Sequence, residues 1–237
     1  MNRVSFPFLF ESSLCAVFRH GNGILRRMEV GRRQVDIANW NRKELFALFR
    51  DFYEPCYGIT SRVDCTEAYQ YCKDLGFSFF ISCLYWTLKA AQEVEAFGLR
   101  IDEEKLFQYD RIDAGSVIDK PDGTFGFGYF IYNSDMRLFV QDAMAEVEEV
   151  RERASLNRPE AKNVIRYSSL PWIDFSSITH AQKSSKDDGF PRVTFGKMSE
   201  TSGRRSMPVA VHVNHALVDG RDVGKFLELF QQLLSNP

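Results

Sequence analysis

Histidine is scarce in this chain, and two of its four histidines lie in one segment near the C-terminus. Residues 209–220 read VAVHVNHALVDG and contain His212 and His215. Side chains alternate between the faces of a β-strand, so the three valines and His215 share one face, which we expect to be buried. A desolvated imidazole stays neutral, and a neutral imidazole at the end of a strand can act as a general base. A core histidine that is hydrogen-bonded to a backbone carbonyl is the other interpretation.

The residues after His215 give the pattern His-x-x-x-Asp-Gly, between an apolar strand and an amphipathic helix expected over residues 223–234. This arrangement resembles the signature of the coenzyme A-dependent acyltransferases. Three further segments resemble the chloramphenicol acetyltransferases within that group, in the same order along the chain: residues 35–46 (VDIANWNRKELF), 168–175 (SSLPWIDF) and 191–197 (PRVTFGK). The resemblance covers roughly residues 35–234.

The resemblance implies direct transfer of an acetyl group from acetyl-CoA to a hydroxyl of chloramphenicol or a related compound. His215 matches the catalytic base of the family, which removes the proton of the acceptor hydroxyl as its oxygen attacks the thioester. Ser168 matches the hydroxyl donor to the oxyanion of the tetrahedral intermediate. Thr194 matches a residue that orients a bound water in the same site. Without the resemblance, Ser168 and Thr194 would be interpreted as satisfied strand hydroxyls.

The resemblance also implies a structural role for Asp219, paired with Arg42, rather than a place in a catalytic triad. A carboxylate taken out of water needs a charged partner, and arginine offers a bidentate one. We therefore expect an ion pair between Asp219 and Arg42 and expect the backbone of His215 to orient its own ring. We expect no metal, because His212 and His215 point to opposite faces.

Members of the family are homotrimers, so the resemblance implies active sites between subunits. His215 would come from one subunit, and Ser168 with much of the acceptor pocket would come from its neighbour. The aromatic residues Phe49, Phe125, Phe127 and Tyr129 are candidates for the pocket wall. They could equally be plain core or interface residues.

The chain departs from the family pattern at several positions, and these concern the acceptor more than the reaction. Asn214 replaces the first of two adjacent histidines, and Met198 replaces a frequent tyrosine. The loop over residues 181–189 (AQKSSKDDG) is unusually polar, and the extension before Gly31 has no counterpart.

The composition predicts a globular chain with a sizeable core. The 237 residues are 44% hydrophobic, and the formal net charge is −2. A near-neutral chain has no global electrostatic attraction to nucleic acid or to an anionic membrane, so we expect neither partner. The most apolar stretch, residues 77–88, is shorter than the roughly 20 residues of a spanning helix. Five cysteines, an odd number without a metal-ligand spacing, indicate buried free thiols in a reducing compartment, hence the cytoplasm.

Residues 1–33 lack strand or helix periodicity, and we expect a poorly ordered N-terminal extension followed by one domain over residues 34–237. Periodicity predicts helices over residues 40–52, 66–74, 77–97, 134–153 and 223–234. It predicts strands over residues 57–63, 98–102, 106–109, 112–118, 125–132, 164–168, 192–198 and 207–213. The mixture favours an α/β fold, a two-layer sandwich of a mixed β-sheet packed by helices, like that of the coenzyme A-dependent acyltransferases.

Four alternatives stay open at this point. The acceptor could be another hydroxyl compound. The chain could be the core of a dihydrolipoamide acyltransferase, although lipoyl domains and Ala/Pro linkers are missing, or a nonribosomal condensation domain, which needs a chain about twice as large. It could also be a non-enzymatic trimeric relative that only binds a ligand.

Overall fold

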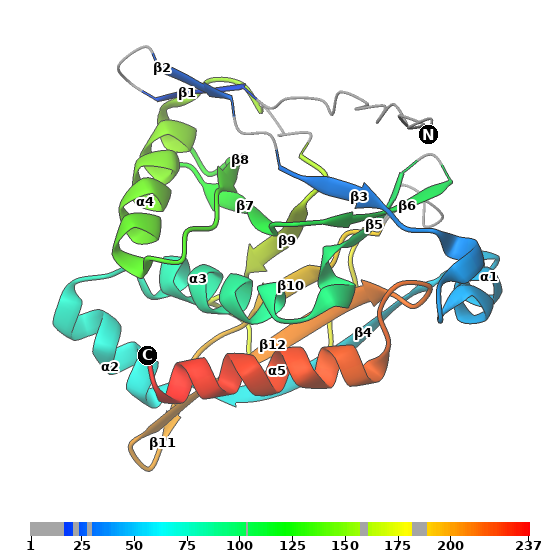
Figure 1. The fold of residues 1–237 in the computed structure, drawn as a ribbon. Helices are drawn as coiled ribbons and strands as arrows, with labels where there is room; N and C mark the ends of the chain where they lie inside the picture. The colour runs from blue at the N-terminus through cyan, green and yellow to red at the C-terminus, as the bar shows by residue number, and fades with distance from the viewer. Residues whose placement is uncertain (1–16, 21–23, 28–29, 103, 157–160, 182–188) are drawn as a thin grey trace, which may run out of the picture.

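A mixed β-sheet of seven strands runs through the centre of the chain, with helices packed on one face (Figure 1). The computed structural model describes residues 17–20, 24–27, 30–102, 104–156, 161–181 and 189–237. Six strands lie in the order β4 (Cys56–Asp64), β12 (Arg204–Asn214), β10 (Arg192–Phe195), β9 (Val164–Ser169), β7 (Asp113–Asp119) and β8 (Phe125–Phe130), and β11 (Ser199–Thr201) pairs with the start of β12. Strand β9 is parallel to both of its neighbours, and the other pairs are antiparallel.

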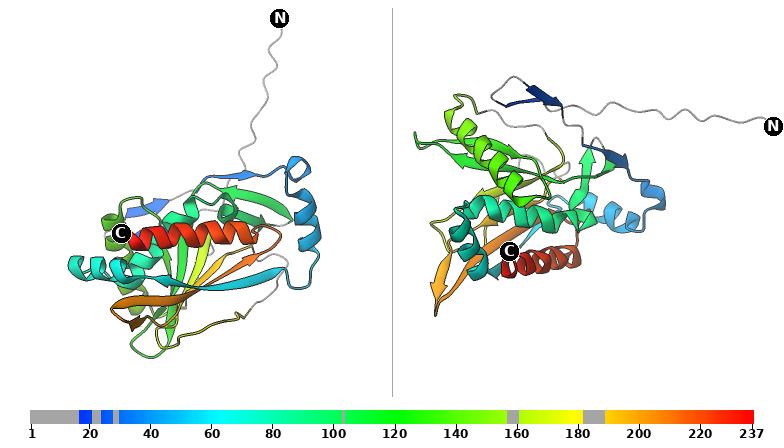
Figure 2. Two further views of the ribbon diagram at one scale, coloured as in Figure 1. Left: turned by 90° about the horizontal axis from the view of Figure 1, so that it is seen from below. Right: turned by 60° about the vertical axis from the view of Figure 1, so that its left-hand side comes forward.

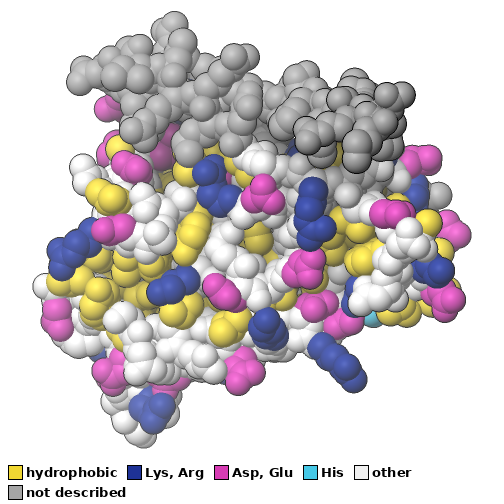
Figure 3. Space-filling model, in the orientation of Figure 1, with side chains coloured by type: hydrophobic (Ala, Val, Ile, Leu, Met, Phe, Trp, Pro, Cys, Tyr) yellow, Lys and Arg dark blue, Asp and Glu magenta, His cyan; other side chains and the backbone are white. Residues whose placement is uncertain are grey.

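Four helices form the second layer: α2 (Thr66–Leu75), α3 (Phe79–Gln92), α4 (Met136–Glu152) and α5 (Gly220–Ser235). Helix α3 is central, and ten of its residues are buried. Helix α5 lies along β4, as Figure 2 shows. The predicted two-layer α/β fold is therefore confirmed. On this helix-covered face, basic and acidic side chains are interspersed rather than segregated (Figure 3).

A smaller β-sheet and several short helices accompany the main sheet. Strands β3 (Arg32–Gln34), β6 (Lys105–Tyr109) and β5 (Leu99–Asp102) form an antiparallel sheet. The 3-10 turn η1 (Ile37–Asn39) leads into helix α1 (Lys43–Arg50), and a second 3-10 turn, η2 (Glu95–Gly98), precedes β5.

The boundary of the N-terminal extension differs from the expected one. Arg32 and Arg33 pair with β6, so the body of the protein begins before residue 34. Within the extension, β1 (Val17–His20) and β2 (Ile24–Arg27) form an antiparallel hairpin. Residues 1–16, 21–23 and 28–29, which belong to the same extension, lie outside the described residues.

Apolar periodicity gave most elements but misplaced some ends. The helix predicted over residues 77–97 ends at Gln92, because the apolar residues that follow, Val94 and Phe97, are buried in the η2 turn rather than on a helix. Helix α2 ends at Leu75, one residue beyond its predicted end, and Gly76 follows it as a left-handed C-cap with a φ of 68°. Short strands β3 and β11 were not predicted, since three residues carry too little pattern.

The buried face of β12 is the valine face, as expected. Val209, Val211 and Val213 belong to the core beneath the helices. The part of the chain that the structure describes contains no helix long and apolar enough to cross a membrane.

The described cysteines are free thiols. Cys65, Cys72 and Cys83 are buried, and Cys56 is half-buried. Burial raises the pKa of Cys65 to about 12 and also raises the pKa of Cys72 and Cys83. These thiols therefore stay protonated and behave as small core residues. Cys15 lies outside the described residues.

Candidate active site

His215 is the first residue after β12, where the chain leaves the sheet for helix α5. Its backbone N–H donates to the carbonyl of Pro55 at 2.8 Å, which closes the ladder between β12 and β4. The imidazole stacks on Phe49 of α1, with ring centroids 3.9 Å apart and planes within 5°. The ring of Tyr57 of β4 also contacts the imidazole, with ring centroids 4.6 Å apart. His215 thus lies on the valine face of the strand, as predicted, at the edge of the core.

The contacts that hold the His215 ring differ from the expected ones. Its Nδ1 is buried and has no hydrogen-bond partner among the described residues, so the predicted bond to its own backbone is absent. Stacking against Phe49 and contact with Tyr57 hold the ring instead. Burial raises the pKa of Tyr57 to about 12, and the nearby carboxylates of Asp219 and Asp222 add to this, so its phenol stays neutral beside the imidazole.

Asp219 and Arg42 form the expected ion pair, with Nη1 of Arg42 2.7 Å from Oδ2 of Asp219. The other carboxylate oxygen of Asp219 caps helix α5 by accepting from the backbone N–H groups of Arg221 and Asp222. Burial alone would raise the pKa of Asp219, but the hydrogen bond from Arg42 and the cap bonds outweigh it and hold the pKa below its usual value. The pair ties the N-cap residue of α1 to the N-cap residue of α5.

Ser168 and Thr194 are neighbours on the opposite face of the sheet. They are directly paired in the parallel ladder between β9 and β10, and Thr194 is paired with Ala210 of β12. Both line a cavity of about 540 Å³, on the face away from the helices, which neither His215 nor Phe49 lines. From Ala210 to His215 the extended chain advances by five residue positions, roughly 16 Å. Within one chain, therefore, His215 does not reach Ser168 or Thr194.

Of the four aromatic residues predicted for the acceptor pocket, the structure places two in the cavity wall. Phe127 and Tyr129 line it from β8. Phe125 is exposed at the start of β8, packed edge-on against Phe127 at 5.7 Å. Phe49 lies with His215, on the other side of the molecule's sheet.

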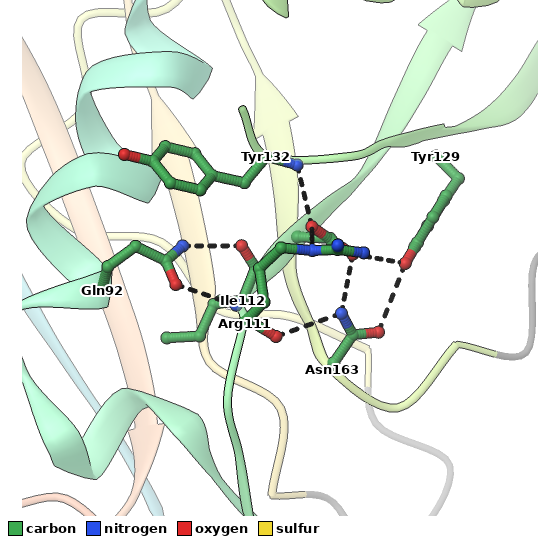
Figure 4. A network of polar contacts seen from close by, with 7 residues as sticks. Gln92, Arg111, Ile112, Tyr129, Tyr132 and Asn163 are labelled. Atoms are coloured by element: carbon green, nitrogen blue, oxygen red, sulfur yellow. Dashed lines mark hydrogen bonds and ion pairs between the residues drawn. The ribbon is translucent and has the colours of Figure 1, made fainter. Parts of the chain in front are cut away.

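The position of the Tyr129 ring is fixed by a buried network around Asp113 (Figure 4). The fully buried Asp113 carboxylate accepts from the Tyr129 hydroxyl at 2.6 Å, from Asn163 at 2.7 Å and from the guanidinium of Arg111 at 2.9 and 3.0 Å. The backbone N–H of Tyr132 adds a bond at 2.8 Å. The hydroxyl of Tyr129 therefore donates its hydrogen bond within this network.

Two histidines that the sequence analysis did not single out as functional lie beside Thr194. His180 lines the cavity, with its Nε2 3.4 Å from Oγ1 of Thr194, and its ring packs edge-on against His212 at 4.7 Å. Nε2 of His212 is 3.0 Å from the carbonyl oxygen of Ile178. Burial lowers the pKa of His180 to about 4, helped by the charges of His212 and Arg192. The alternation of β12 places His212 on this face, but nothing in the sequence indicates that residue 180 folds back onto it.

No group of three or more His, Cys, Asp or Glu side chains suited to a metal occurs among the residues the structure describes. The geometry offers the imidazole of His215 between aromatic rings on one face of the sheet, and a pair of hydroxyls in a cavity on the other face. Such groups suit proton abstraction and oxyanion stabilisation.

Comparisons with known proteins give the family. The family model "CAT: Chloramphenicol acetyltransferase" matches residues 31–231. Chloramphenicol acetyltransferase 2 of Escherichia coli is 28% identical over 209 residues, 86% of this chain and 97% of that protein. Chloramphenicol acetyltransferase of Campylobacter coli is 29% identical over 213 residues, 85% of this chain and 98% of that protein.

Solved structures agree. A chloramphenicol acetyltransferase superposes with a TM-score of 0.81 at 34% identity, covering 86% of this chain and all of the other. The dihydrolipoamide acetyltransferase of Azotobacter vinelandii gives a TM-score of 0.60 at 16% identity, covering 77% of this chain and 82% of the other, and so shares the fold. The chain belongs to the chloramphenicol acetyltransferase family, and it is an acetyltransferase.

Proposed function

We propose that the protein transfers the acetyl group of acetyl-CoA to a hydroxyl of a small acceptor, with His215 as general base. The acceptor oxygen attacks the thioester carbonyl carbon while His215 takes the hydroxyl proton. The carbon–sulfur bond then breaks, and the proton passes to the departing thiolate, which leaves as coenzyme A. Chloramphenicol, the acceptor named for the relatives, is the first acceptor to test.

Ser168 and Thr194 serve the oxyanion in this proposal. Ser168 donates its hydroxyl to the oxygen that becomes negative in the tetrahedral intermediate, and Thr194 supports the same region through a water. Removing one such donor costs roughly a hundredfold or more in kcat in other enzymes. The two residues are neighbours on adjacent strands and line one cavity, which supports a shared role.

One observation supports a site between subunits: within one chain, the proposed base lies far from the two hydroxyls that would serve the oxyanion. His215 lies at the end of β12 beside Phe49, whereas Ser168 and Thr194 line a cavity on the opposite face. We therefore propose a homotrimer in which His215 of one subunit faces the cavity of the next.

Exposed apolar side chains beside both halves support this assembly. Leu45 and Leu48 are exposed on the same helix as Phe49, and Trp172 and Ile173 are exposed just after Ser168. Apolar surface of this kind, next to functional groups, indicates an interface between copies. The buried free thiols fit a reducing compartment, so we propose the cytoplasm as the location.

Thiol release from acetyl-CoA, with and without chloramphenicol, tests the reaction. We expect thiol release that depends on the acceptor and is lost in His215→Ala. Light scattering should show that the variant assembles to the same size as the wild type. Unchanged turnover in His215→Ala would refute the mechanism.

Hybrid assemblies test the composite site. His215→Ala and Ser168→Ala subunits should each be nearly inactive alone. When they are co-expressed in equal amounts, a site that takes one residue from each subunit is intact in about a quarter of cases, so about a quarter of wild-type activity should return. No recovery in mixed assemblies would show that both residues serve from the same chain.

A further inference from the structure

The cavity that Ser168 and Thr194 line also has two arginines, Arg166 and Arg192, in its wall. In the ladder that joins β9, β10 and β12, Arg166, Arg192 and His212 are directly opposite one another. Ser168 and Thr194 form the neighbouring row on the same face, two residues further along β9 and β10. Two residues of strand span about 7 Å, so the Cα atoms of the hydroxyl row and of the arginine row lie about that far apart.

Both arginines line the cavity from their strands of the sheet, Arg166 from β9 and Arg192 from β10. Arg192 is 8% exposed, and the guanidinium of Arg166 lies 4.1 Å from the ring centroid of Phe190, which fixes its plane. Lys162 lines the same cavity, while the lining residues that the structure describes include no aspartate or glutamate. Both arginines make other contacts as well, but a guanidinium has five N–H donors and can serve more than one partner.

His180 adds a second kind of donor to this wall. Its ring lies between the two rows, in contact with Thr194 and with His212. Burial keeps the pKa of His180 at about 4, so its imidazole is neutral at neutral pH. A neutral imidazole there can donate to, or accept from, a polar group of a bound molecule.

Building on the acetyl transfer proposed above, we propose that the acceptor is a hydroxyl compound that also carries an anionic group, a carboxylate or a phosphate, on the side of the arginine row. The hydroxyl lies at Ser168 and Thr194, and the anion binds Arg192 and Arg166. A buried guanidinium binds an oxyanion bidentately and strongly, because little water competes.

Acetyl-CoA is the other source of anionic groups. The whole pantetheine arm separates its phosphates from the thioester, so a phosphate cannot lie one row away from the group that stabilises the thioester oxyanion. The experiment below keeps the two sources apart.

The test uses two acceptors that differ only in charge, 4-(hydroxymethyl)benzoate and its methyl ester. The values of kcat/KM for each acceptor, and KM for acetyl-CoA, are measured for the wild type, Arg192→Gln, Arg192→Lys and Arg204→Gln. Arg204 is a matched control, since it is an exposed arginine at the far end of β12, paired with Asp64. We expect the wild type to prefer the acid by about tenfold to a hundredfold, as for a charge-assisted pair.

Arg192→Gln should abolish the preference for the acid, Arg192→Lys should retain part of it, and Arg204→Gln should leave it unchanged. Equal use of acid and ester by the wild type would overturn the inference. A raised KM for acetyl-CoA in Arg192→Gln, with the preference intact, would assign the arginines to the co-substrate and overturn it too.

Calorimetric titration of the same proteins with acid and ester separates this inference from the proposed reaction. Selective binding of the acid that Arg192→Gln loses supports an anion site even if no acetyl transfer occurs. Absence of selective binding overturns the anion site even if thiol release from acetyl-CoA is robust.

Discussion

The ion pair between Arg42 and Asp219 can be separated from the helix cap that Asp219 also provides. One carboxylate oxygen accepts from Arg42, and the other accepts from the first backbone N–H groups of α5. Asp219→Asn removes the charge and keeps a good capping residue, whereas Asp219→Ala removes both. Arg42→Ala and the double variant with Asp219→Asn complete a thermodynamic cycle for the pair.

The size of each effect follows from burial. The side chains of Arg42 and Asp219 are 20% and 32% exposed, so the pair is stronger than a surface bridge and weaker than a fully buried one. Nε and Nη2 of Arg42 are buried without a partner among the described residues, and Nη1 lies 2.7 Å from Asp219 and 3.9 Å from Asp222, so Asp219 is the nearer of two carboxylates that pair with this guanidinium. We expect Asp219→Asn to lower the free energy of unfolding by about 1–3 kcal/mol, and Asp219→Ala by about 1 kcal/mol more because the cap is lost.

Urea unfolding at a fixed protomer concentration measures these free energies, and the cycle should give a coupling of about 1–2 kcal/mol. Activity should fall only modestly, since Asp219 acts through the positions of Phe49 and His215. A coupling below about 0.5 kcal/mol would show that the pair does not stabilise the fold. A loss near 10⁴-fold in kcat with unchanged stability, of about the size seen when a triad carboxylate is neutralised, would show that Asp219 takes part in the chemistry.

Two further predictions concern the cavity. Because His180 has a pKa of about 4 in the folded chain against 6.5 when exposed, the unfolded chain binds more protons between these values, and stability must fall as the pH falls. His180 should contribute a drop of about 1–2 kcal/mol in the free energy of unfolding from pH 7 to pH 5, and His212, whose pKa burial also lowers, should add to it. His180→Leu should therefore reduce the drop by about its own share in denaturant titrations at both pH values. Asp113→Asn removes the charge that pairs with Arg111 and replaces one of the two acceptor oxygens by an amide NH2, which would face the donors of the network, so unfolding titrations should show a loss of about 3–5 kcal/mol; a loss under 1 kcal/mol would contradict the role given to the network.

The elements of the fold were largely predictable because their patterns are strong. Strand β12 carries a valine stripe, and α5 begins at an Asp-Gly that both caps the helix and ends the loop. The misplaced end of α3 has a physical reason: an apolar run continues wherever the chain is buried, whether or not it stays helical. Strand order depends on contacts between distant segments, which one sequence does not display.

The candidate catalytic residues were predictable only through their match to family motifs. A lone histidine on an apolar stripe is usually a core residue, and a serine such as Ser168 is usually a satisfied strand hydroxyl. The prediction that the backbone would orient His215 was wrong, since its Nδ1 has no partner among the described residues and ring stacking holds it. Stacking partners such as Phe49 come from another element, and their geometry depends on the packing of α1.

The cavity wall escapes sequence reasoning for a different reason. Arg166, Arg192 and His212 are far apart in the chain, and only the register of three strands places them in one row beside Ser168 and Thr194. A shift of one residue in any of these pairings would turn the side chains of that strand to the helix face. In the proposed reaction the motif residues perform the chemistry, whereas the register places the groups that would select the acceptor. A family member can keep the His-x-x-x-Asp-Gly motif intact while the charges in the neighbouring row select an acceptor of different chemistry.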